Sequence, residues 1–205
     1  QSKEGLLMPR TEIQNLELRD QRREQILMAA LKVFSRRGMV ATKISEIAKE
    51  ANLSHGLVYH YFKSKEEIFT LLVRRAAESS VHIIEKAHLQ KWTPLRKIKW
   101  LTEQILQSLS EEEHILLFLI MIQASTSDAV PEEVKQLFTS PEYKSPVTCL
   151  IPLIIEGQQC NEFIQEDPIT LAVSYFAFIQ GFSINKLQWN ECPIPEADLI
   201  IKIFK

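Results

Sequence analysis

The chain has 205 residues, of which 45% are hydrophobic and 24% are charged, and its formal net charge is −2. This composition is typical of a globular protein with one large domain or two small ones, which excludes a wholly disordered chain. The longest unbroken apolar run, residues 115–122, is too short to cross a bilayer. Cys149, Cys160 and Cys192 are odd in number and lack metal-ligand spacing, so we expect no disulfide framework and a reducing cytoplasm as the location.

The charges are divided unevenly along the chain. Residues 1–65 contain 12 Lys and Arg against 7 Asp and Glu, whereas residues 66–205 contain 12 against 19. A basic first part and an acidic second part suggest that the two parts perform different tasks.

Helix formers dominate the chain and only five residues are glycine, which predicts an all-α fold with about nine helices and no strand. Residues 1–18 lack a sustained hydrophobic period, so we expect a flexible lead-in there. The first helix is predicted over residues 19–37, where apolar residues recur at steps of three and four. Gly38 follows this helix at a position that favours a left-handed residue.

Two short helices follow the first one. They are predicted over residues 44–51 and 55–61, with a three-residue break between them. Ser54 is a suitable N-cap for the second of them. Ser64, with a glutamate three residues later, forms a capping box that opens a long helix to about residue 90.

Proline and acidic residues mark where the remaining helices begin. The helix that contains residues 115–122 is apolar nearly all round and should be buried. Pro146 and Pro152 can bend the helix that contains them or move its start. The predicted segments are 95–109, one from 111 onward, 132–138, 141–163, 169–189 and a short one at the chain end.

The two short helices after a packing helix describe a helix-turn-helix, in which the second short helix enters the major groove of DNA. Ile47, Ala48, Leu53 and Val58 provide its apolar core. The leading end of the second helix can meet base edges, and the hydroxyl and basic groups around it can meet phosphates. The candidate DNA contacts are Thr42, Lys43, Ser54, His55, Gly56, Leu57, Tyr59, His60, Lys63 and Lys65.

This part of the sequence resembles the TetR (tetracycline-repressor) family of bacterial regulators. The resemblance is carried by Ala29, Ala30 and Phe34 and by the segments 38–42 (GMVAT), 44–51 (ISEIAKEA), 53–62 (LSHGLVYHYF) and 63–69 (KSKEEIF). One position departs from the family pattern, because Lys43 stands where the family usually has Thr or Ser. Either Thr42 caps the next helix in its place, or Lys43 makes a charged contact with phosphate.

The resemblance implies an all-helical homodimer that binds a palindromic operator. Residues 19–64 would be the DNA-binding head and residues 65–205 the ligand-binding and dimerisation body of a repressor that a hydrophobic small molecule releases from DNA. The helix over 169–189 looks like the family's penultimate helix, which usually forms a four-helix dimer interface with the last one. The candidate interface residues are Val173, Phe176, Gly181, Ile184 and Leu187.

The effector pocket should be mostly apolar with a few polar groups that orient the ligand. The sequence has no Gly-rich phosphate-binding loop, which argues against a nucleotide as the ligand. The candidate ligand-binding residues are Trp100, His114, Phe118, Met121, Ile122, Gln123, Leu150, Ile154, Tyr175, Ile179 and Gln180.

A helical-bundle enzyme is the main alternative. Glu85 with His88, and Glu111 with His114, have the Glu-x-x-His spacing of di-iron carboxylate sites. Their positions near helix ends also explain them as charges that complement helix dipoles, and no inward-facing pair of glutamates completes a metal site. We therefore expect no enzyme activity, no cofactor and no metal. A third alternative is a DNA-architectural dimer without an effector, which a closed body without a cavity would favour.

Overall fold

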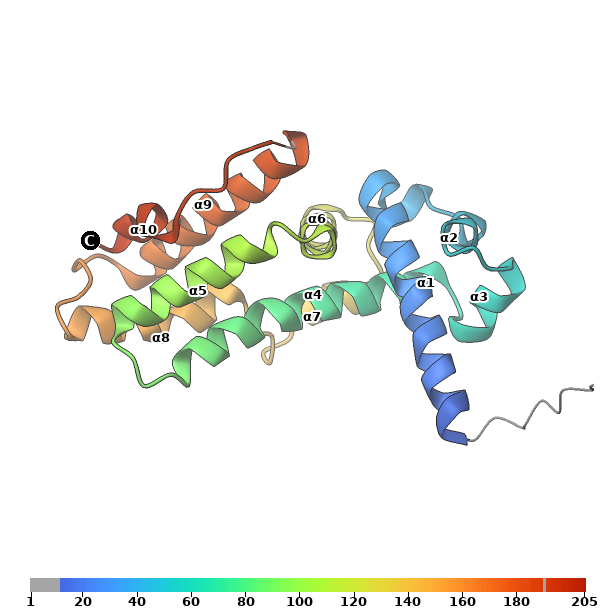
Figure 1. The fold of residues 1–205 in the computed structure, drawn as a ribbon, viewed down its shortest axis with the longest axis horizontal. Helices are drawn as coiled ribbons and strands as arrows, with labels where there is room; N and C mark the ends of the chain where they lie inside the picture. The colour runs from blue at the N-terminus through green and yellow to red at the C-terminus, as the bar shows by residue number, and fades with distance from the viewer. Residues whose placement is uncertain (1–11, 190) are drawn as a thin grey trace, which may run out of the picture. The chain divides into compact units, whose positions relative to one another are not determined.

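The computed structural model describes residues 12–189 and 191–205, and this part of the chain is helical without any strand (Figure 1). The predicted all-α fold is confirmed. None of these described helices combines the length and the hydrophobicity that crossing a membrane requires. The elements are α1 (Glu12–Ala41), α2 (Ile44–Glu50), α3 (His55–Tyr61), α4 (Lys65–His88), α5 (Pro94–Ser108), α6 (Glu112–Thr126), α7 (Glu132–Thr139), α8 (Pro146–Gln159), α9 (Pro168–Gln188), α10 (Ala197–Ile200) and a 3₁₀ turn, η1 (Ile201–Phe204).

The chain divides into two compact units, one that ends at Phe69 and one that runs from Thr70 to Lys205. The division falls inside α4, the helix at whose start the sequence analysis placed the boundary. Each unit has a hydrophobic core of its own.

Helix α1 begins earlier than predicted. It starts at Glu12 rather than at Arg19, so residues 12–18 are helical and do not belong to a flexible lead-in. This segment (EIQNLEL) contains good helix formers and neither glycine nor proline, which explains the extension. Residues 1–11, the rest of the predicted lead-in, lie outside the described part of the chain. At the other end of α1, Gly38 has a φ of 74° and a ψ of 159°, so the positive φ expected of this glycine is present, but its ψ is extended and not that of a left-handed helical cap.

Apolar contacts hold the first unit together. Phe34 of α1 meets Phe69 edge to face, with ring centroids 5.5 Å apart. Ile47 and Val58, which were predicted to form the helix-turn-helix core, are fully buried, and Leu53 is half-buried. Helix α2 packs against both α1 and α3, so these contacts set the direction of α3.

Side chains of α1 also bind the ends of the two short helices. The Gln25 side-chain amide donates to the Ala51 carbonyl at 2.7 Å, just after α2. The Arg23 guanidinium lies over the Phe62 ring at 4.4 Å and donates to the Tyr61 carbonyl at 3.3 Å, where α3 ends. The C-terminal carbonyls of both helices therefore find partners on α1.

Helix α8 starts later than predicted. It begins at Pro146 rather than at Pro141, because the Ser145 hydroxyl caps it and a proline suits the first helical position. The preceding segment is a turn, closed by a hydrogen bond of 3.0 Å from the Tyr143 N–H to the Ser140 carbonyl.

Helix α6 is less buried than predicted. Leu117, Ile120 and Ala124 are its buried residues, whereas the other apolar side chains of the run 115–122 are half-buried. A helix that is apolar on every side does not indicate which face will meet a neighbour. Within the second unit, α9 packs against it.

Tyr175 of α9 is the largest of the fully buried side chains. Its ring lies near the rings of Phe176 and Phe204, with centroid separations of 5.1 and 5.5 Å. Its hydroxyl is 2.9 Å from that of Thr102, and Thr102 donates its own hydrogen to the Ile98 carbonyl. Tyr175 is therefore the donor, and burial raises its pKa, so the phenol keeps its proton.

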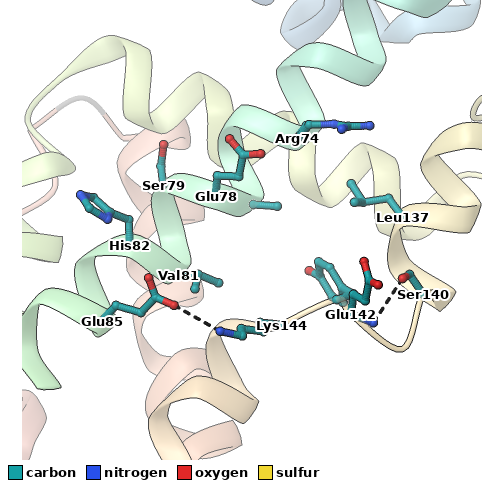
Figure 2. Close-up of a pocket in the computed structure, with 12 residues that line it drawn as sticks. Arg74, Glu78, Ser79, Val81, His82, Glu85, Leu137, Ser140, Glu142 and Lys144 are labelled. Carbon is teal, nitrogen blue, oxygen red and sulfur yellow. Dashed lines mark hydrogen bonds and ion pairs between the residues drawn. The ribbon is translucent and has the colours of Figure 1, made fainter.

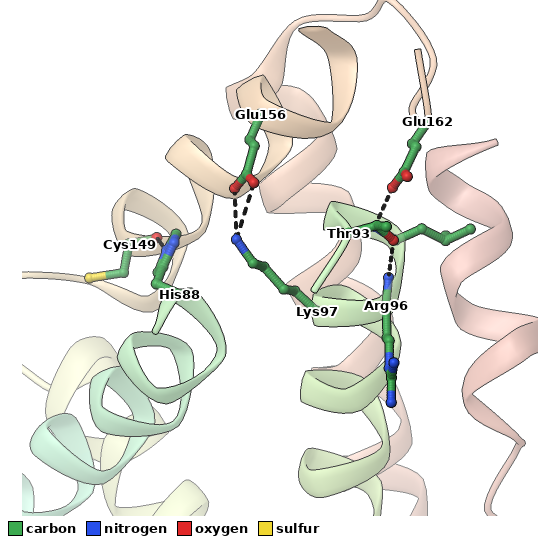
Figure 3. Close-up of polar contacts among 8 residues, drawn as sticks. His88, Thr93, Arg96, Lys97, Cys149, Glu156 and Glu162 are labelled. Carbon is green, nitrogen blue, oxygen red and sulfur yellow. Dashed lines mark hydrogen bonds and ion pairs between the residues drawn. The ribbon is translucent and has the colours of Figure 1, made fainter. Parts of the chain in front are cut away.

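Polar contacts join α5 to the far end of α8 (Figure 3). The Lys97 ammonium is nearly buried and lies 3.1 Å from the Glu156 carboxylate. The Leu95 N–H, in the first turn of α5, donates to the Glu162 carboxylate at 2.7 Å. A buried ammonium needs such a partner, so this pair fixes how α5 and α8 lie against each other.

We expect Gly157→Ala to destabilise the second unit. A Cβ atom at position 157 would overlap the ring of Phe163, which is buried against the ring of Phe204 and cannot move aside. The free energy of unfolding in urea should fall by about 1–3 kcal/mol, the usual cost of overpacking. Gly56→Ala is the matched control, since a Cβ atom there meets nothing within 4 Å. Equal stability of the two variants would contradict this packing.

Candidate functional site

Helix α3 of the first unit presents its leading end to solvent. Ser54 caps it by accepting a hydrogen bond of 3.2 Å from the Leu57 N–H, as predicted, and Val58 anchors it in the core. Ser54, His55 and Gly56 are all exposed. This end of α3 is therefore accessible to a partner, as the second helix of a helix-turn-helix must be.

Aromatic side chains with polar groups continue the same surface along α3. The rings of His55 and Tyr59 meet edge to face with centroids 4.9 Å apart, and half of Tyr59 is exposed. His60 is exposed as well, whereas Leu57 is half-buried. Imidazole and phenol groups in these positions can form hydrogen bonds to base edges and to phosphates.

Nothing within the first unit requires glycine rather than alanine at position 56. A Cβ atom at this position meets no atom within 4 Å. Glycine inside a helix costs about 1 kcal/mol relative to alanine, so the first unit would be more stable without it. Close approach of an external molecule to the backbone of α3 gives a reason for glycine at this position.

Thr42 and Lys43 have different surroundings. Thr42 is only 1% exposed, and its hydroxyl donates to the Gly38 carbonyl at 2.8 Å, so its side chain is not available to DNA. Lys43 is the N-cap residue of α2, and its backbone N–H donates to the Glu46 carboxylate at 2.9 Å. The side chain of Lys43 is exposed. Of the two alternatives for this position, a charged contact by Lys43 is the one that remains open.

Lys65 is bound within the first unit. Its ammonium donates to the carbonyls of Met39, Val40 and Thr42 at 3.0, 2.9 and 2.8 Å. An ammonium has three donors, so all of them are used at the turn between α1 and α2. Lys63 is exposed by contrast, and it is the lysine of this pair that is available to a phosphate.

The Ser64 cap of the predicted capping box is present, but the reciprocal bond goes to the residue before the cap. The Ser64 hydroxyl accepts a hydrogen bond of 3.1 Å from the Glu67 N–H. The Glu67 carboxylate in turn accepts from the Lys63 N–H at 2.6 Å. These two hydrogen bonds fix the backbone between α3 and α4.

Most of the predicted dimer residues lie on the surface of α9. Val173, Gly181, Ile184 and Leu187 are exposed, whereas Phe176 is half-buried and packs against the core. Other exposed apolar side chains lie on the same helix, Ile169 and Phe178 among them, and were not among the predicted interface residues.

The segment that follows α9 was expected to accompany it in a four-helix interface. Its apolar residues Ile200, Ile201 and Phe204 are buried in the core of their own unit, whereas Leu199 is exposed. Helix α8 also packs beside α9 and exposes Ile155, so both neighbours of α9 offer an apolar side chain to a partner. Which of them takes part in an interface stays a prediction.

The eleven predicted ligand residues are spread over the second unit. Leu150, Ile154, Tyr175 and Ile179 are buried in its core, and Trp100 packs partly buried against it. The α6 residues Phe118, Met121, Ile122 and Gln123 are half-buried, and His114 and Gln180 are exposed. Their role in binding a ligand stays a prediction.

The second unit contains a groove of about 650 Å³ at a different place (Figure 2). One wall is a continuous face of α4, and the other is formed by the end of α7 and the turn before α8. None of the eleven predicted ligand residues lines it. The lining residues are Arg74, Ala77, Glu78, Ser79, Val81, His82, Glu85, Leu137, Ser140, Glu142, Tyr143 and Lys144. This volume lies within the range of small-molecule sites.

Both Glu-x-x-His pairs are engaged in other contacts. Glu85 lies 3.4 Å from the Lys144 ammonium, and His88 at the end of α4 lies 2.9 Å from the Cys149 carbonyl, so its Nε2 carries a hydrogen (Figure 3). Glu111 and His114 pair with each other at 3.2 Å. Among the described residues, no three His, Cys, Asp or Glu side chains come together in a group that could hold a metal ion.

The three cysteines differ in their surroundings. Cys192 is buried and Cys149 half-buried, and burial raises the pKa of the Cys149 thiol, which makes it a poor nucleophile at neutral pH. Cys160 is exposed, whereas a free cysteine is usually buried as a small hydrophobic residue.

Comparison with known proteins bears on both units. Residues 26–72 match the model of bacterial regulatory proteins, tetR family. The chain is 42% identical over 60 residues to the transcriptional regulator HbdR of Aromatoleum sp. (strain CIB), covering 29% of this chain and 26% of that protein. It is 31% identical over 102 residues to the regulator AcrR of Shigella flexneri, covering 49% and 47%. A solved TetR-family regulator of Thermus thermophilus, PfmR, matches with a TM-score of 0.66 and 22% identity over 87% of this chain and 96% of that one.

The exposed α3, its caps and its buried anchors define the first unit as a helix-turn-helix. The match to the family model shows that residues 26–72 resemble bacterial regulatory proteins of the tetR family, and both relatives are transcriptional regulators. The solved structure shows the fold. The chain spans about half or less of the length of the two relatives.

We expect Lys65→Ala to destabilise the first unit. The substitution removes the Lys65 donor from three carbonyls, two of them partly buried and that of Val40 exposed, and bonds from a charged group are worth about 1–3 kcal/mol. Thermal unfolding should therefore occur at a lower temperature. Lys63→Ala is the control, because the Lys63 side chain is exposed. If both variants melt together with the parent protein, the Lys65 contacts do not support the fold.

Proposed function

We propose that the protein is a sequence-specific DNA-binding transcriptional regulator, a repressor that a small-molecule effector releases from its operator. The observation that carries the proposal is the leading end of α3. Ser54, His55 and Gly56 are exposed there, and the unit itself gives no reason for the glycine. A regulator of this kind acts in the cytoplasm, where bacterial DNA lies.

The proposed contacts fall into two groups. His55 and Leu57, at the start of α3, would read base edges in the major groove. Tyr59, His60 and Lys63, together with Lys43 at the start of α2, would bind phosphates. The surplus of Lys and Arg in residues 1–65 adds a favourable field for DNA.

The effector would bind in the groove of the second unit. A ligand there contacts α4, whose first residues belong to the DNA-binding unit. A ligand that binds one orientation of α4 more tightly than another lowers DNA affinity by that difference. The groove favours this reading over a DNA-architectural dimer, which would need no cavity. The sequence predicted a hydrophobic effector, and the groove adds charged groups beside apolar ones.

The protein would bind DNA as a homodimer. Val173, Ile184 and Leu187 are exposed on α9, and apolar side chains gathered on one helix face mark an interaction surface. A two-fold dimer places the same face of both subunits together, which suits a palindromic operator. We propose that α8 and α9 of each subunit form this interface.

We expect two variants to lose DNA affinity in different ways. Lys63→Ala removes one phosphate contact, so binding should weaken on all sequences alike and the slope of log K against log salt should fall by about one. Gly56→Ala adds a methyl group at the proposed DNA surface, so binding should weaken while thermal stability stays equal or rises. Fluorescence anisotropy on an operator selected from random DNA measures both.

Normal DNA affinity of both variants would contradict the proposed contact surface. Failure of the selection to enrich any palindrome would contradict sequence-specific binding as such.

We expect Gly181→Glu to dissociate the dimer. It places a carboxylate on the proposed interface, and an unpaired charge in a desolvated contact costs about 3 kcal/mol or more. Sedimentation velocity should show a monomer at concentrations where the parent protein is dimeric. Gln136→Glu, an exposed change on α7, is the control. A Gly181→Glu protein that stays dimeric and binds a palindrome normally would place the interface elsewhere.

A further inference from the structure

The rim of the groove carries more negative than positive charge. Glu78, Glu85 and Glu142 contribute three carboxylates, whereas Arg74 and Lys144 contribute two cations. Lys144 lies 3.4 Å from Glu85, so these two charges balance each other. Within the described part of the chain, Glu78 and Glu142 have no ion-pair partner. Two carboxylates are thus available to a ligand.

The two cations lie at opposite ends of the groove. Arg74 and Glu85, which holds Lys144, are separated by eleven residues of α4, or about 16 Å along the helix axis. Glu78 lies between them, and Figure 2 shows Glu142 across the groove on the segment before α8. The middle of the groove therefore offers carboxylates from both walls.

Apolar groups line the same groove. Ala77 is buried, and Val81, Leu137 and Tyr143 are half-buried. The Tyr143 ring is held by Phe138, which meets it edge to face at 5.3 Å. Burial raises the pKa of Tyr143, so its ring stays a neutral phenol. A neutral aromatic ring attracts a cation to its face, and the aliphatic groups can bury an apolar ligand body.

We propose that this groove binds an organic cation with an apolar body, whose charged group lies between Glu78 and Glu142. The identification rests on the proposal that the second unit binds an effector. Residues 70–205 contain 12 Lys and Arg against 17 Asp and Glu, so the field of the whole unit also attracts cations.

Arg74 is the group that would favour a ligand of the opposite charge. An anion at Arg74 would lie one helical turn from Glu78 and in the field of an acidic unit. Both interactions are repulsive, so a fatty acid or another carboxylate should bind more weakly than a cation of the same apolar body.

Three probes with one chain length test the charge of the ligand. The full chain is titrated by calorimetry with octyltrimethylammonium, octanoate and octyl glucoside, each below the concentration at which it forms micelles. The cation should bind about tenfold more tightly than the anion or the neutral probe, and raising the salt concentration should weaken it.

Two groove variants and one control locate the site. Glu78→Gln and Glu142→Gln should each lower the affinity for octyltrimethylammonium by about two- to fivefold, the usual effect of a solvent-accessible ion pair, without changing octyl glucoside binding. Glu133→Gln on α7 removes an exposed carboxylate outside the groove and should change neither. Thermal unfolding of the three variants should match that of the parent, because all three side chains are exposed.

Octanoate or octyl glucoside binding as tightly as the cation would overturn the proposal, and so would unchanged cation affinity in both groove variants. The operator-binding assay separates this from the proposed function. If the protein binds its operator and a ligand of different chemistry releases it, the regulator stands and the cation groove fails. If the cation binds in the groove without changing operator affinity, the groove stands and the effector half of the proposed function fails.

Discussion

The three hydrogen bonds of the Lys65 ammonium hold together the first unit, which we propose binds DNA. They tie the first residue of α4 to the carbonyls of Met39, Val40 and Thr42, at the end of α1 and just before α2. The Thr42 hydroxyl closes the same turn on Gly38, whose positive φ ends the regular part of α1. The direction of α2, and of α3 packed against it, follows from this turn. A helix that must fit a DNA groove needs such a fixed support.

Helix α4 connects the two proposed activities. Its first turn is held by the Ser64 cap and by Lys65, inside the first unit, and its later turns form one wall of the groove. A helix transmits a displacement along its length because its backbone hydrogen bonds resist bending. A ligand that draws the wall of α4 toward the turn before α8 would therefore act on the same rigid element that supports the head. The free energy that couples ligand binding to DNA binding can be no larger than the difference in the ligand's binding free energy between two positions of that wall.

Residue type alone does not indicate which side chains pack into the core and which line the groove. Tyr175 and Leu150 were predicted as pocket walls and are buried in the core, where Tyr175 donates to Thr102. The groove is instead lined by charged side chains such as Glu78 and Glu142, which in sequence look like an ordinary solvated face. A signal for it existed in the prolines at positions 141 and 146, which shift the start of α8 and create the turn that forms the second wall.

The all-α class, the limits of α3, the caps at Ser54 and Ser64 and the positive φ at Gly38 could be predicted from the sequence, because each depends on neighbours within four residues along the chain. The exposed face of α3 could be predicted as well, since a helix of seven residues with one buried side chain, Val58, has only one face turned to the core. Which of two nearby lysines has a free side chain, and where the second unit contains a groove, could be known from the tertiary structure alone. Those features depend on contacts between residues far apart in the chain, such as Lys65 with Met39 or Lys144 with Glu85. The local sequence pattern around each residue does not indicate such contacts.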